Sequence, residues 1–382
     1  MKRRLTIITE IIAPYRIPVF NALAALPEID LVVLFLSETD PSLREWRVCT
    51  EEIRFRYEVL PSFRRRLGKY NLLLNHGVTA ALRRARPDVV LCGGYGYLAS
   101  WRAAYWARQR RLPFLLWIES TAADQRSRHL VVESLKRHYF NLCGGFVVPG
   151  RSSSDYVKQF PTGNRPIFTA PNAIDNDFFH KGAEDAWRND SDGKLRQRLD
   201  LPDAYFLYVG RLVEAKGVFD LIEAYAKLES HLRSTVSLVF VGDGPARQEL
   251  VARARNVSPG RIQFRGFQQK EQLPVHYALA RALVFPTYSD TWGLVVNEAM
   301  ACGLPVIASN VAGCVADLIE GRGTGFTIHP GDVSALASAM RTVSGDDNTR
   351  AQMSQTALRR ILDYSPQACA AGIAESALSV TG

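Results

Sequence analysis

Residues 282–309, ALVFPTYSDTWGLVVNEAMACGLPVIAS, hold two short apolar runs with one helical segment between them. The runs at 282–286 and 305–308 each have the length of a buried parallel strand. The helix between them is expected to begin near Gly293 and to end at Gly303, where glycine can adopt the positive φ of a helix C-cap. A strand–helix–strand unit of this kind predicts a parallel α/β sheet.

The start of this helix predicts a site for a phosphorylated ligand. A helix N-terminus beyond a strand presents unpaired N–H groups and partial positive charge, and Gly293 lets a phosphate approach the backbone. Asp290 and Thr291 stand at N-cap positions, and Glu298 follows two turns into the helix. Because carboxylates accept hydrogen bonds from hydroxyl groups, a nucleotide sugar would use all these features. The alternative is a structural helix with two solvated acids.

Length and charge indicate two domains with different partners. A chain of 382 residues exceeds the size at which a single core stops growing, about 250–300 residues. Residues 1–170 hold 26 Lys or Arg against 14 Asp or Glu, whereas residues 171–382 hold 21 against 24. The basic first half favours an anionic partner, such as a membrane surface, a lipid phosphate or a nucleic acid.

Cysteine usage and hydropathy point to the cytoplasm. The six cysteines show no metal-ligand spacing and fit buried thiols in a reducing compartment, so no metal site is predicted. No apolar run approaches the ~18 residues of a membrane span, and Glu10 interrupts the first apolar stretch. We therefore expect a cytoplasmic protein, which can be peripheral on the inner face of the cell membrane.

Strands alternate with helices in both halves, which predicts two parallel sheets with helices on both faces. In the first half we expect strands at residues 5–9, 30–36, 55–60, 88–94, 113–120, 144–150 and 167–170. In the second half we expect them at 205–209, 237–244, 262–267, 282–286, 305–308 and 325–330.

Two segments of the first half mix basic and apolar residues. Residues 63–76, FRRRLGKYNLLLNH, are either a segment that lies on an anionic membrane or a solvated turn leading into a core helix. Residues 100–111, SWRAAYWARQRR, interleave aromatic residues with arginine. A lipid surface or RNA would suit that helix, but packing of one face on the sheet is favoured.

The run from Ser289 to Ser309 resembles the signature of glycosyltransferase family 4, retaining enzymes of the GT-B fold. In that signature two acidic residues eight positions apart flank an aromatic–glycine pair. The resemblance implies that the first acid, Asp290 here, binds hydroxyls of the donor sugar and that Glu298 binds the ribose. The first acid is usually Glu, so Asp290 is a departure that shortens the reach by one methylene.

Further donor contacts follow from the same resemblance. Gly210, Arg211 and Lys216 in GRLVEAK resemble the Gly-Arg…Lys pattern whose two cations bind the donor diphosphate. A guanidinium and an ammonium can stabilise the charge of a leaving diphosphate without a metal. Gly266 and Phe267 resemble the loop that holds the base. The remaining contacts are expected at Thr291, Trp292, Gly293 and Leu294.

The first half resembles the family less. Ile12-Ala13-Pro14 replaces a Gly-Gly loop, and Arg16 is either a substitute phosphate contact or a surface charge. Glu119 stands where the family often has a histidine near the reacting sugar, with His129 and His138 as alternatives. We therefore place Arg16 and Glu119 on the acceptor side. The catalytic candidates are Arg211, Lys216, Asp290 and Glu119.

Residues 171–179, PNAIDNDFF, resemble the interdomain segment of the family, with Asp175 and Phe179 in its pattern. The resemblance implies a GT-B fold: two Rossmann-like α/β domains with parallel sheets facing across a cleft. The expected domains are residues 1–172 for the acceptor, residues 173–364 for the nucleotide sugar, and a helix in 365–382 that returns to the first domain.

The implied activity is retaining, metal-independent transfer of a hexosyl-type sugar to a hydroxyl of a glycan or lipid-linked acceptor. Bacterial polysaccharide, lipopolysaccharide or glycolipid synthesis is the expected setting. The co-substrate is a nucleotide-diphosphate sugar, with a UDP-sugar favoured, and no other cofactor is implied. An anionic membrane surface is an expected partner and nucleic acid is not. The alternatives are a GT-B epimerase or phosphorylase, or a non-catalytic protein that binds nucleotide sugars.

Overall fold

The computed structural model describes the chain except residues 1, 41–45, 68–69, 124–129 and 381–382. The chain forms two compact units. The first comprises Met1–Ile174 with Ser365–Gly382, and the second comprises Asp175–Tyr364. Asp175 is the N-cap of the first helix of the second unit, and its carboxylate accepts a hydrogen bond from the Phe178 N–H at 3.1 Å.

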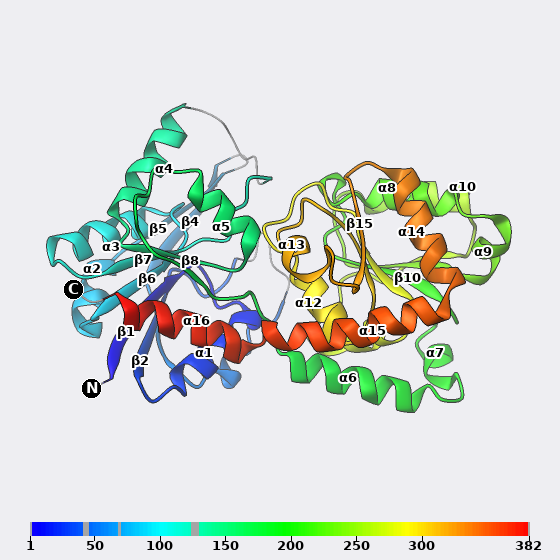
Figure 1. The fold of residues 1–382 in the computed structure, drawn as a ribbon, viewed down its shortest axis with the longest axis horizontal. Helices are drawn as coiled ribbons and strands as arrows, with labels where there is room; N and C mark the ends of the chain where they lie inside the picture. Colours follow the sequence, from blue (N-terminus) through cyan, green and yellow to red (C-terminus); the bar gives the residue numbers. More distant parts are fainter. Residues whose placement is uncertain (1, 41–45, 68–69, 124–129, 381–382) are drawn as a thin grey trace. The chain divides into compact units, whose positions relative to one another are not determined.

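The first unit is built on seven parallel strands in the order β3-β2-β1-β6-β7-β8-β9 (Figure 1). Their bounds are β1 Arg3–Thr9, β2 Ile29–Phe35, β3 Arg56–Val59, β6 Val89–Gly93, β7 Phe114–Trp117, β8 Gly145–Val148 and β9 Ile167–Thr169. The helices are α1 Ile17–Ala24, α2 Val78–Ala85, α3 Leu98–Gln109, α4 Leu130–Leu142, α5 Arg151–Lys158 and α16 Pro366–Ser379, with 3₁₀ turns η1 Pro14–Arg16 and η2 Thr50–Glu52.

The helices of the first unit cover both faces of this sheet, so the apolar strands are buried on either side. Residues of α1 and α16 share one hydrophobic core, and residues of α2 to α5 share the other. The C-terminal helix α16 packs closely on the sheet, because a Cβ at Gly372 would lie 2.1 Å from the Thr169 carbonyl oxygen. Only glycine allows this approach, which fixes α16 against the edge strand β9.

The sequence leaves two alternatives for residues 63–76, a segment on an anionic membrane or a solvated turn before a core helix. The structure forms a β-hairpin here, which the second alternative does not contain. Its strands, β4 Ser62–Leu67 and β5 Tyr70–Asn75, are antiparallel. Leu73 is buried in the core while Phe63 and Leu72 are exposed. The three consecutive leucines suggest a helix, but a strand places alternate side chains on opposite faces, and only the middle leucine is needed by the core.

The second unit is built on six parallel strands in the order β12-β11-β10-β13-β14-β15. Their bounds are β10 Tyr205–Val209, β11 Ser237–Val241, β12 Ile262–Phe264, β13 Ala282–Phe285, β14 Val306–Ser309 and β15 Gly325–Ile328. The helices are α6 Asn176–Asn189, α7 Lys194–Arg198, α8 Val218–Ala226, α9 Ser230–Thr235, α10 Arg247–Val257, α11 Leu273–Ala278, α12 Leu294–Ala301, α13 Val315–Leu318, α14 Val333–Gly345 and α15 Asp347–Ile361, with 3₁₀ turns η3 Glu214–Lys216, η4 Lys270–Gln272 and η5 Leu362–Tyr364.

The helix α6 is absent from the sequence-based prediction, which treats its residues as an interdomain segment followed by a polar stretch. Phe179, Ala183 and Ala186 form the buried stripe of this helix at helical spacing. The motif that marks the domain boundary is therefore also the start of a helix whose apolar face packs on α11 and α12.

Each sheet has one point where the strand order reverses. In the first unit β2 and β3 lie on one side of β1, and β6 to β9 lie on the other side, so the order reverses between β1 and β6. In the second unit the same reversal places β13 beside β10, with Phe206 opposite Ala282 and Leu207 opposite Leu283. Ligands of open α/β sheets bind at the carboxyl ends of the strands at such a point.

Among the residues that the structure describes, none of the helices combines the length and the apolar character needed to span a bilayer.

Candidate active site

The predicted donor residues meet at the reversal point of the second sheet. Gly210, Arg211 and Lys216 lie in the loop that follows β10, whereas the segment from Asp290 to Leu294 follows β13. Because β10 and β13 are paired neighbours, two loops about 80 residues apart in sequence emerge side by side at the same edge.

Lys216 and Asp290, predicted as separate ligand-binding groups, are bonded to each other. The Lys216 ammonium donates to an Asp290 carboxylate oxygen at 2.7 Å and to the Ser289 carbonyl oxygen at 2.9 Å. The other Asp290 oxygen accepts from the Trp292 N–H at 3.0 Å. Each side chain of the pair is 23% exposed, so a ligand can reach both.

Two glycines allow these loops to pack. Gly217 has φ +67°, and a Cβ there would lie 2.0 Å from the Pro286 carbonyl oxygen, so the loop after β10 contacts the end of β13 only through glycine. Gly293 is the N-cap of α12 with φ +99°, and a Cβ there would lie 2.8 Å from the Phe285 ring. Since Gly293 carries no side chain, the first N–H groups of α12 stay open to an anion.

Arg211 is the second cation of this edge. Arg211 is exposed, and its guanidinium has no hydrogen-bond or ion-pair partner among the residues that the structure describes. Its position is fixed through the backbone, because the buried Tyr208 hydroxyl donates to the Arg211 carbonyl oxygen at 2.8 Å. An unpaired guanidinium beside an open helix N-terminus suits a phosphate group.

Glu298 lies in α12 and is held by a tyrosine from a neighbouring helix. The hydroxyl of Tyr277, in α11, donates to the Glu298 carboxylate at 2.6 Å. Burial raises the pKa of Glu298 to about 7, against the hydrogen bond from Tyr277 and the positive charge of Lys270, which lower it. The carboxylate is therefore short of hydrogen-bond donors, and ligand hydroxyl groups would stabilise its charged form.

Trp292, predicted to bind the donor, has a buried side chain, so only its backbone could contact a ligand here. Its side chain is 2% exposed, and its indole N–H donates to the Asn297 side chain at 2.9 Å. The aromatic residue of the signature instead anchors the loop to the core. Thr291 and Leu294, its neighbours among the predicted contacts, are partly exposed at the start of α12.

Gly266 and Phe267, predicted to hold the base, follow the edge strand β12. Gly266 has φ +68°, its carbonyl oxygen accepts from the Gly242 N–H at 2.7 Å, and Phe267 is 40% exposed. β12 is separated from β10 by one strand, and neighbouring strands lie about 4.8 Å apart. Only an extended ligand could touch both Phe267 and Arg211.

In the first unit, Arg16 and Glu119 are brought together by the fold. Arg16 ends the 3₁₀ turn η1 that follows β1, and its guanidinium forms an ion pair with Glu119, which follows β7. The guanidinium also lies over the Trp117 ring, 4.0 Å from its centroid. The two acceptor-side candidates are thus one pair at the carboxyl edge of the first sheet.

The histidine alternatives do not reach this edge in the described structure. His129 lies outside the described residues. His138 belongs to α4, where its ring stacks on Trp101 and its Nε2 bonds to the Tyr105 hydroxyl at 2.8 Å. Packing between helices accounts for His138.

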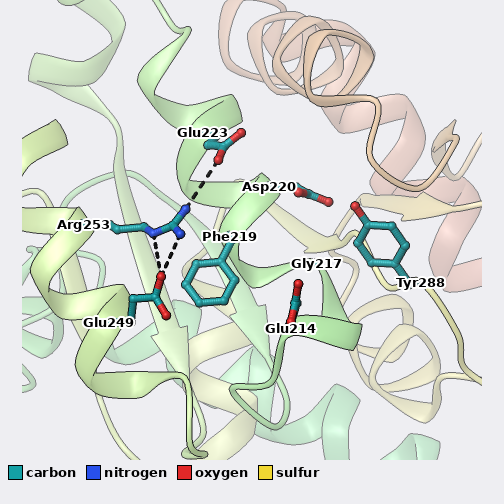
Figure 2. A pocket seen from close by; sticks show the side chains of 8 residues that line it. All are labelled: Glu214, Gly217, Phe219, Asp220, Glu223, Glu249, Arg253 and Tyr288. Carbon is teal, nitrogen blue, oxygen red and sulfur yellow. Dashed lines mark hydrogen bonds and ion pairs between the residues drawn. The ribbon is translucent and has the colours of Figure 1, made fainter.

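A pocket of about 330 Å³ lies beside the donor edge (Figure 2). Its wall carries the carboxylates Glu214, Asp220, Glu223 and Glu249. Its guanidinium, Arg253, is paired with Glu249 at 2.7 Å and with Glu223 at 3.5 Å. This negative lining would repel a diphosphate, which makes this pocket a poor phosphate site.

Sequence reasoning missed Tyr277, which orients Glu298, and Ser289, whose carbonyl oxygen helps hold Lys216. Tyr277 carries no signal that distinguishes it from other buried tyrosines. Its apolar helical spacing predicts packing, and its contact with Glu298 exists only in the folded sheet. The Ser289 carbonyl is a backbone group, which no residue pattern could have identified.

Two family models match separate parts of the chain. Residues 192–360 match the model of "Glycosyl transferases group 1", and residues 21–178 match that of "Glycosyltransferase Family 4". The chain is 35% identical to alpha-D-kanosaminyltransferase of Streptomyces kanamyceticus over 43% of its length and 42% of the relative's. It is 31% identical to O-antigen chain mannosyltransferase B of Escherichia coli over 43% of each chain. These alignments span less than half of either relative.

Longer matches have lower identity. A GDP-mannose-dependent alpha-mannosyltransferase of Corynebacterium glutamicum is 28% identical over 75% of this chain and 66% of its own. The structure of Anabaena HepE in complex with UDP has a TM-score of 0.78, with 20% identity and 100% of both chains covered. The structure of WaaG, a glycosyltransferase involved in lipopolysaccharide biosynthesis, has a TM-score of 0.67, with 18% identity and coverage of 98% and 100%.

The two family models cover separate parts of the chain, one in each unit, and the solved structures cover nearly all of it. Both predictions, of family and of fold, are confirmed. The chain belongs to glycosyltransferase family 4 and has the GT-B fold.

Proposed function

We propose that this chain transfers a hexosyl-type sugar from a nucleotide-diphosphate sugar to a hydroxyl of a glycan or lipid-linked acceptor. One observation carries the proposal: two cations, an open helix N-terminus and two carboxylates meet at the reversal point of the second sheet. Relatives named as kanosaminyl- and mannosyltransferases, and HepE structures with UDP and UDP-glucose, support it.

The diphosphate would lie on Arg211, Lys216 and the N–H groups at the start of α12. Breaking the bond between the sugar and the diphosphate leaves negative charge on a phosphate oxygen. A guanidinium and an ammonium fixed at that oxygen stabilise the charge as it develops, which lowers the barrier. Since both cations come from the chain, the proposed reaction is metal-independent.

Asp290 has two tasks in this proposal. Its carboxylate holds the Lys216 ammonium at 2.7 Å, and its remaining lone pairs can accept hydrogen bonds from sugar hydroxyls. When the diphosphate arrives, the ammonium has a second anion beside it and can shift toward the leaving oxygen. Glu298 would accept from the ribose hydroxyls, replacing the hydration that its burial removes.

Retention follows without a protein nucleophile. The acceptor hydroxyl attacks the anomeric carbon from the face that the diphosphate leaves, and a leaving phosphate oxygen takes the hydroxyl proton. The Arg16–Glu119 pair would contact the acceptor. Proton NMR of the product tests retention through its anomeric configuration, and activity that persists in EDTA is expected for a metal-independent enzyme.

The decisive experiment removes the two cations together. Arg211→Ala with Lys216→Ala should abolish both the thermal shift caused by UDP and sugar transfer, because bound ligand stabilises in proportion to its affinity. The matched control is Lys227→Ala with Arg341→Ala, which removes two cations near the C-terminal end of α8, the end away from the Lys216 loop. Unchanged transfer in the first variant, or equal loss in both, would contradict the assignment.

The two alternatives make other predictions for the same assay. Incubation with donor alone would give an epimer or a sugar phosphate if the chain were an epimerase or phosphorylase. Tight binding of UDP-sugars with no transfer to any acceptor would identify a non-catalytic binding protein. The bond between Asp290 and Lys216 gives that last alternative some weight, because it occupies both partners before a ligand arrives.

A further inference from the structure

One segment of the first unit is rich in Lys and Arg and almost free of Asp and Glu. Residues 59–118, which form β4, β5, α2 and α3, hold 11 Lys or Arg and a single acidic residue, Asp88. Asp88 is itself paired with Arg4 at 2.6 Å. From elsewhere, Glu58 reaches Arg84, and Asp40 and Glu10 reach Arg64. Where the structure describes their side chains, the other cations of this stretch have no ion-pair partner and remain available to an external anion.

A groove of about 630 Å³ lies between α2 and α3. We call it the α2–α3 groove. Its lining combines three cations with apolar and aromatic groups, namely Arg83, Arg102, Arg110, Leu98, Tyr105 and Trp106. Arg83 and Arg110 have no ion-pair partner among the described residues, so the groove has a net positive wall.

Exposed apolar groups stand at the rim of this groove. Leu98 is 47% exposed and Tyr105 is 43% exposed. The Tyr105 hydroxyl bonds to His138 at 2.8 Å, which holds its ring in place. Aromatic rings with a polar tip, aliphatic side chains and arginines together are the composition of surfaces that enter the headgroup region of a bilayer.

Within the groove wall, Trp106 is buried beneath Arg110. Its side chain is buried, and its indole N–H has no hydrogen-bond partner in the described part of the chain. The guanidinium of Arg110 lies over the same ring, 4.6 Å from its centroid. A groove occupant would therefore meet the Arg110 guanidinium, which covers the Trp106 ring, and not the indole N–H.

The hairpin continues this surface. In its register Arg65 lies opposite Leu72, so both point to the same face, and Phe63 shares that face two residues away. All three are exposed. The hairpin is tied to α3, because Arg102 donates to the Asn75 carbonyl oxygen at 3.2 Å.

We propose that the α2–α3 groove and the outer face of the hairpin dock on a bilayer that contains anionic phospholipid. Lipid phosphates contact Arg83, Arg102 and Arg110, while Leu98 and Phe63 enter the interface. The exposed aliphatic groups favour lipid over nucleic acid, since RNA offers such side chains no apolar surface to bury them. All residues of this proposed site belong to the first unit, so a failure of the proposed donor site would not affect this proposal.

The test uses vesicle flotation at low salt, with vesicles of phosphatidylcholine alone or mixed with phosphatidylglycerol. Wild-type protein should bind the mixed vesicles, release on added salt and ignore the neutral ones. The triple variant R83Q/R102Q/R110Q should bind roughly 100-fold more weakly, because each cation near an anionic surface contributes about a fivefold factor. The matched control, K2Q/R54Q/K158Q, removes three exposed cations elsewhere in the same unit and should bind as wild type.

Folding of each variant is checked by circular dichroism and by its thermal unfolding midpoint, compared with those of the wild type. Equal loss in the two triple variants would overturn the proposal, because net charge and not the groove would then drive binding. Equal binding to neutral vesicles would also overturn it. So would wild-type protein that fails to float with anionic vesicles but binds an RNA oligonucleotide through the same three arginines.

Discussion

The proposed donor edge of the second unit and the proposed acceptor edge of the first occupy equivalent places in their sheets but are built differently. At the donor edge, short contiguous motifs fix the backbone, and glycines such as Gly217 and Gly293 let two loops touch. At the acceptor edge, an isolated pair of side chains, Arg16 and Glu119, comes together from loops about 100 residues apart. Every nucleotide-diphosphate sugar carries the same diphosphate, which a rigid backbone site can bind. Acceptors differ from enzyme to enzyme, and a site made of side chains can be adapted to a new acceptor by substitution alone.

Removing one cation from each edge should give the largest difference. Lys216→Ala should lower turnover by about 10²–10³-fold, the usual cost of losing a group that stabilises charge in the transition state. Arg16→Ala should lower it by about tenfold or less, because Arg16 is already neutralised by Glu119. Steady-state kinetics with a fixed acceptor measures both, and comparable losses would break the comparison.

Adding one methyl group to a glycine at each edge tests the difference in backbone packing. Gly217→Ala should destabilise the second unit by roughly 3 kcal/mol or more, since a Cβ would lie 2.0 Å from a backbone oxygen. Gly94 follows β6 and has φ +95°, and a Cβ added there would have no atom within 4 Å. Gly94→Ala should therefore destabilise the first unit only by the cost of a left-handed backbone, about 1–2 kcal/mol. Urea unfolding monitored by hydrogen exchange in each unit separates the two. Equal losses would show that the loops of the second unit are less tightly packed than the structure indicates.

These particular residues also show how far the sequence reaches. The strand and loop positions of the donor edge are predictable because each motif is contiguous and its spacing reflects local backbone geometry. The pairing of Glu298 with Tyr277 and of Arg16 with Glu119 is not, since each contact depends on how distant segments cross. The hairpin at 62–75 is not among the predictions for another reason: its apolar run fits a helix and a strand equally well, and the choice depends on packing against the core.

The pH dependence of stability should depend on Glu298. Its pKa is about 7 in the folded protein and near 4.5 in the unfolded chain. The folded protein therefore holds a proton that the unfolded chain releases, and the free energy of unfolding falls as pH rises from about 4.5 to 7. Glu298→Gln should flatten this slope, by roughly 1–3 kcal/mol across the window.

Thermal unfolding at several pH values measures that slope. The matched control is Glu119→Gln at the acceptor edge, which leaves Glu298 in place and should keep the slope of the wild type. An unchanged slope in Glu298→Gln would show that water or protein groups already satisfy this carboxylate. Glu298 would then have no unmet need for hydrogen-bond donors, and the proposed contact with ribose would lose its physical basis.

The smallest change in free energy is expected from the two ion pairs, but UDP should affect one pair and not the other. Double-mutant cycles on Lys216–Asp290 and on Arg16–Glu119 should each give a coupling free energy of about 1 kcal/mol without ligand, since all four side chains are partly exposed. Saturating UDP should reduce only the first coupling, because the diphosphate competes with Asp290 for the ammonium. If UDP left the Lys216–Asp290 coupling unchanged while still binding, Lys216 would be a positioning group for Asp290, and Arg211 with the start of α12 would have to hold the diphosphate.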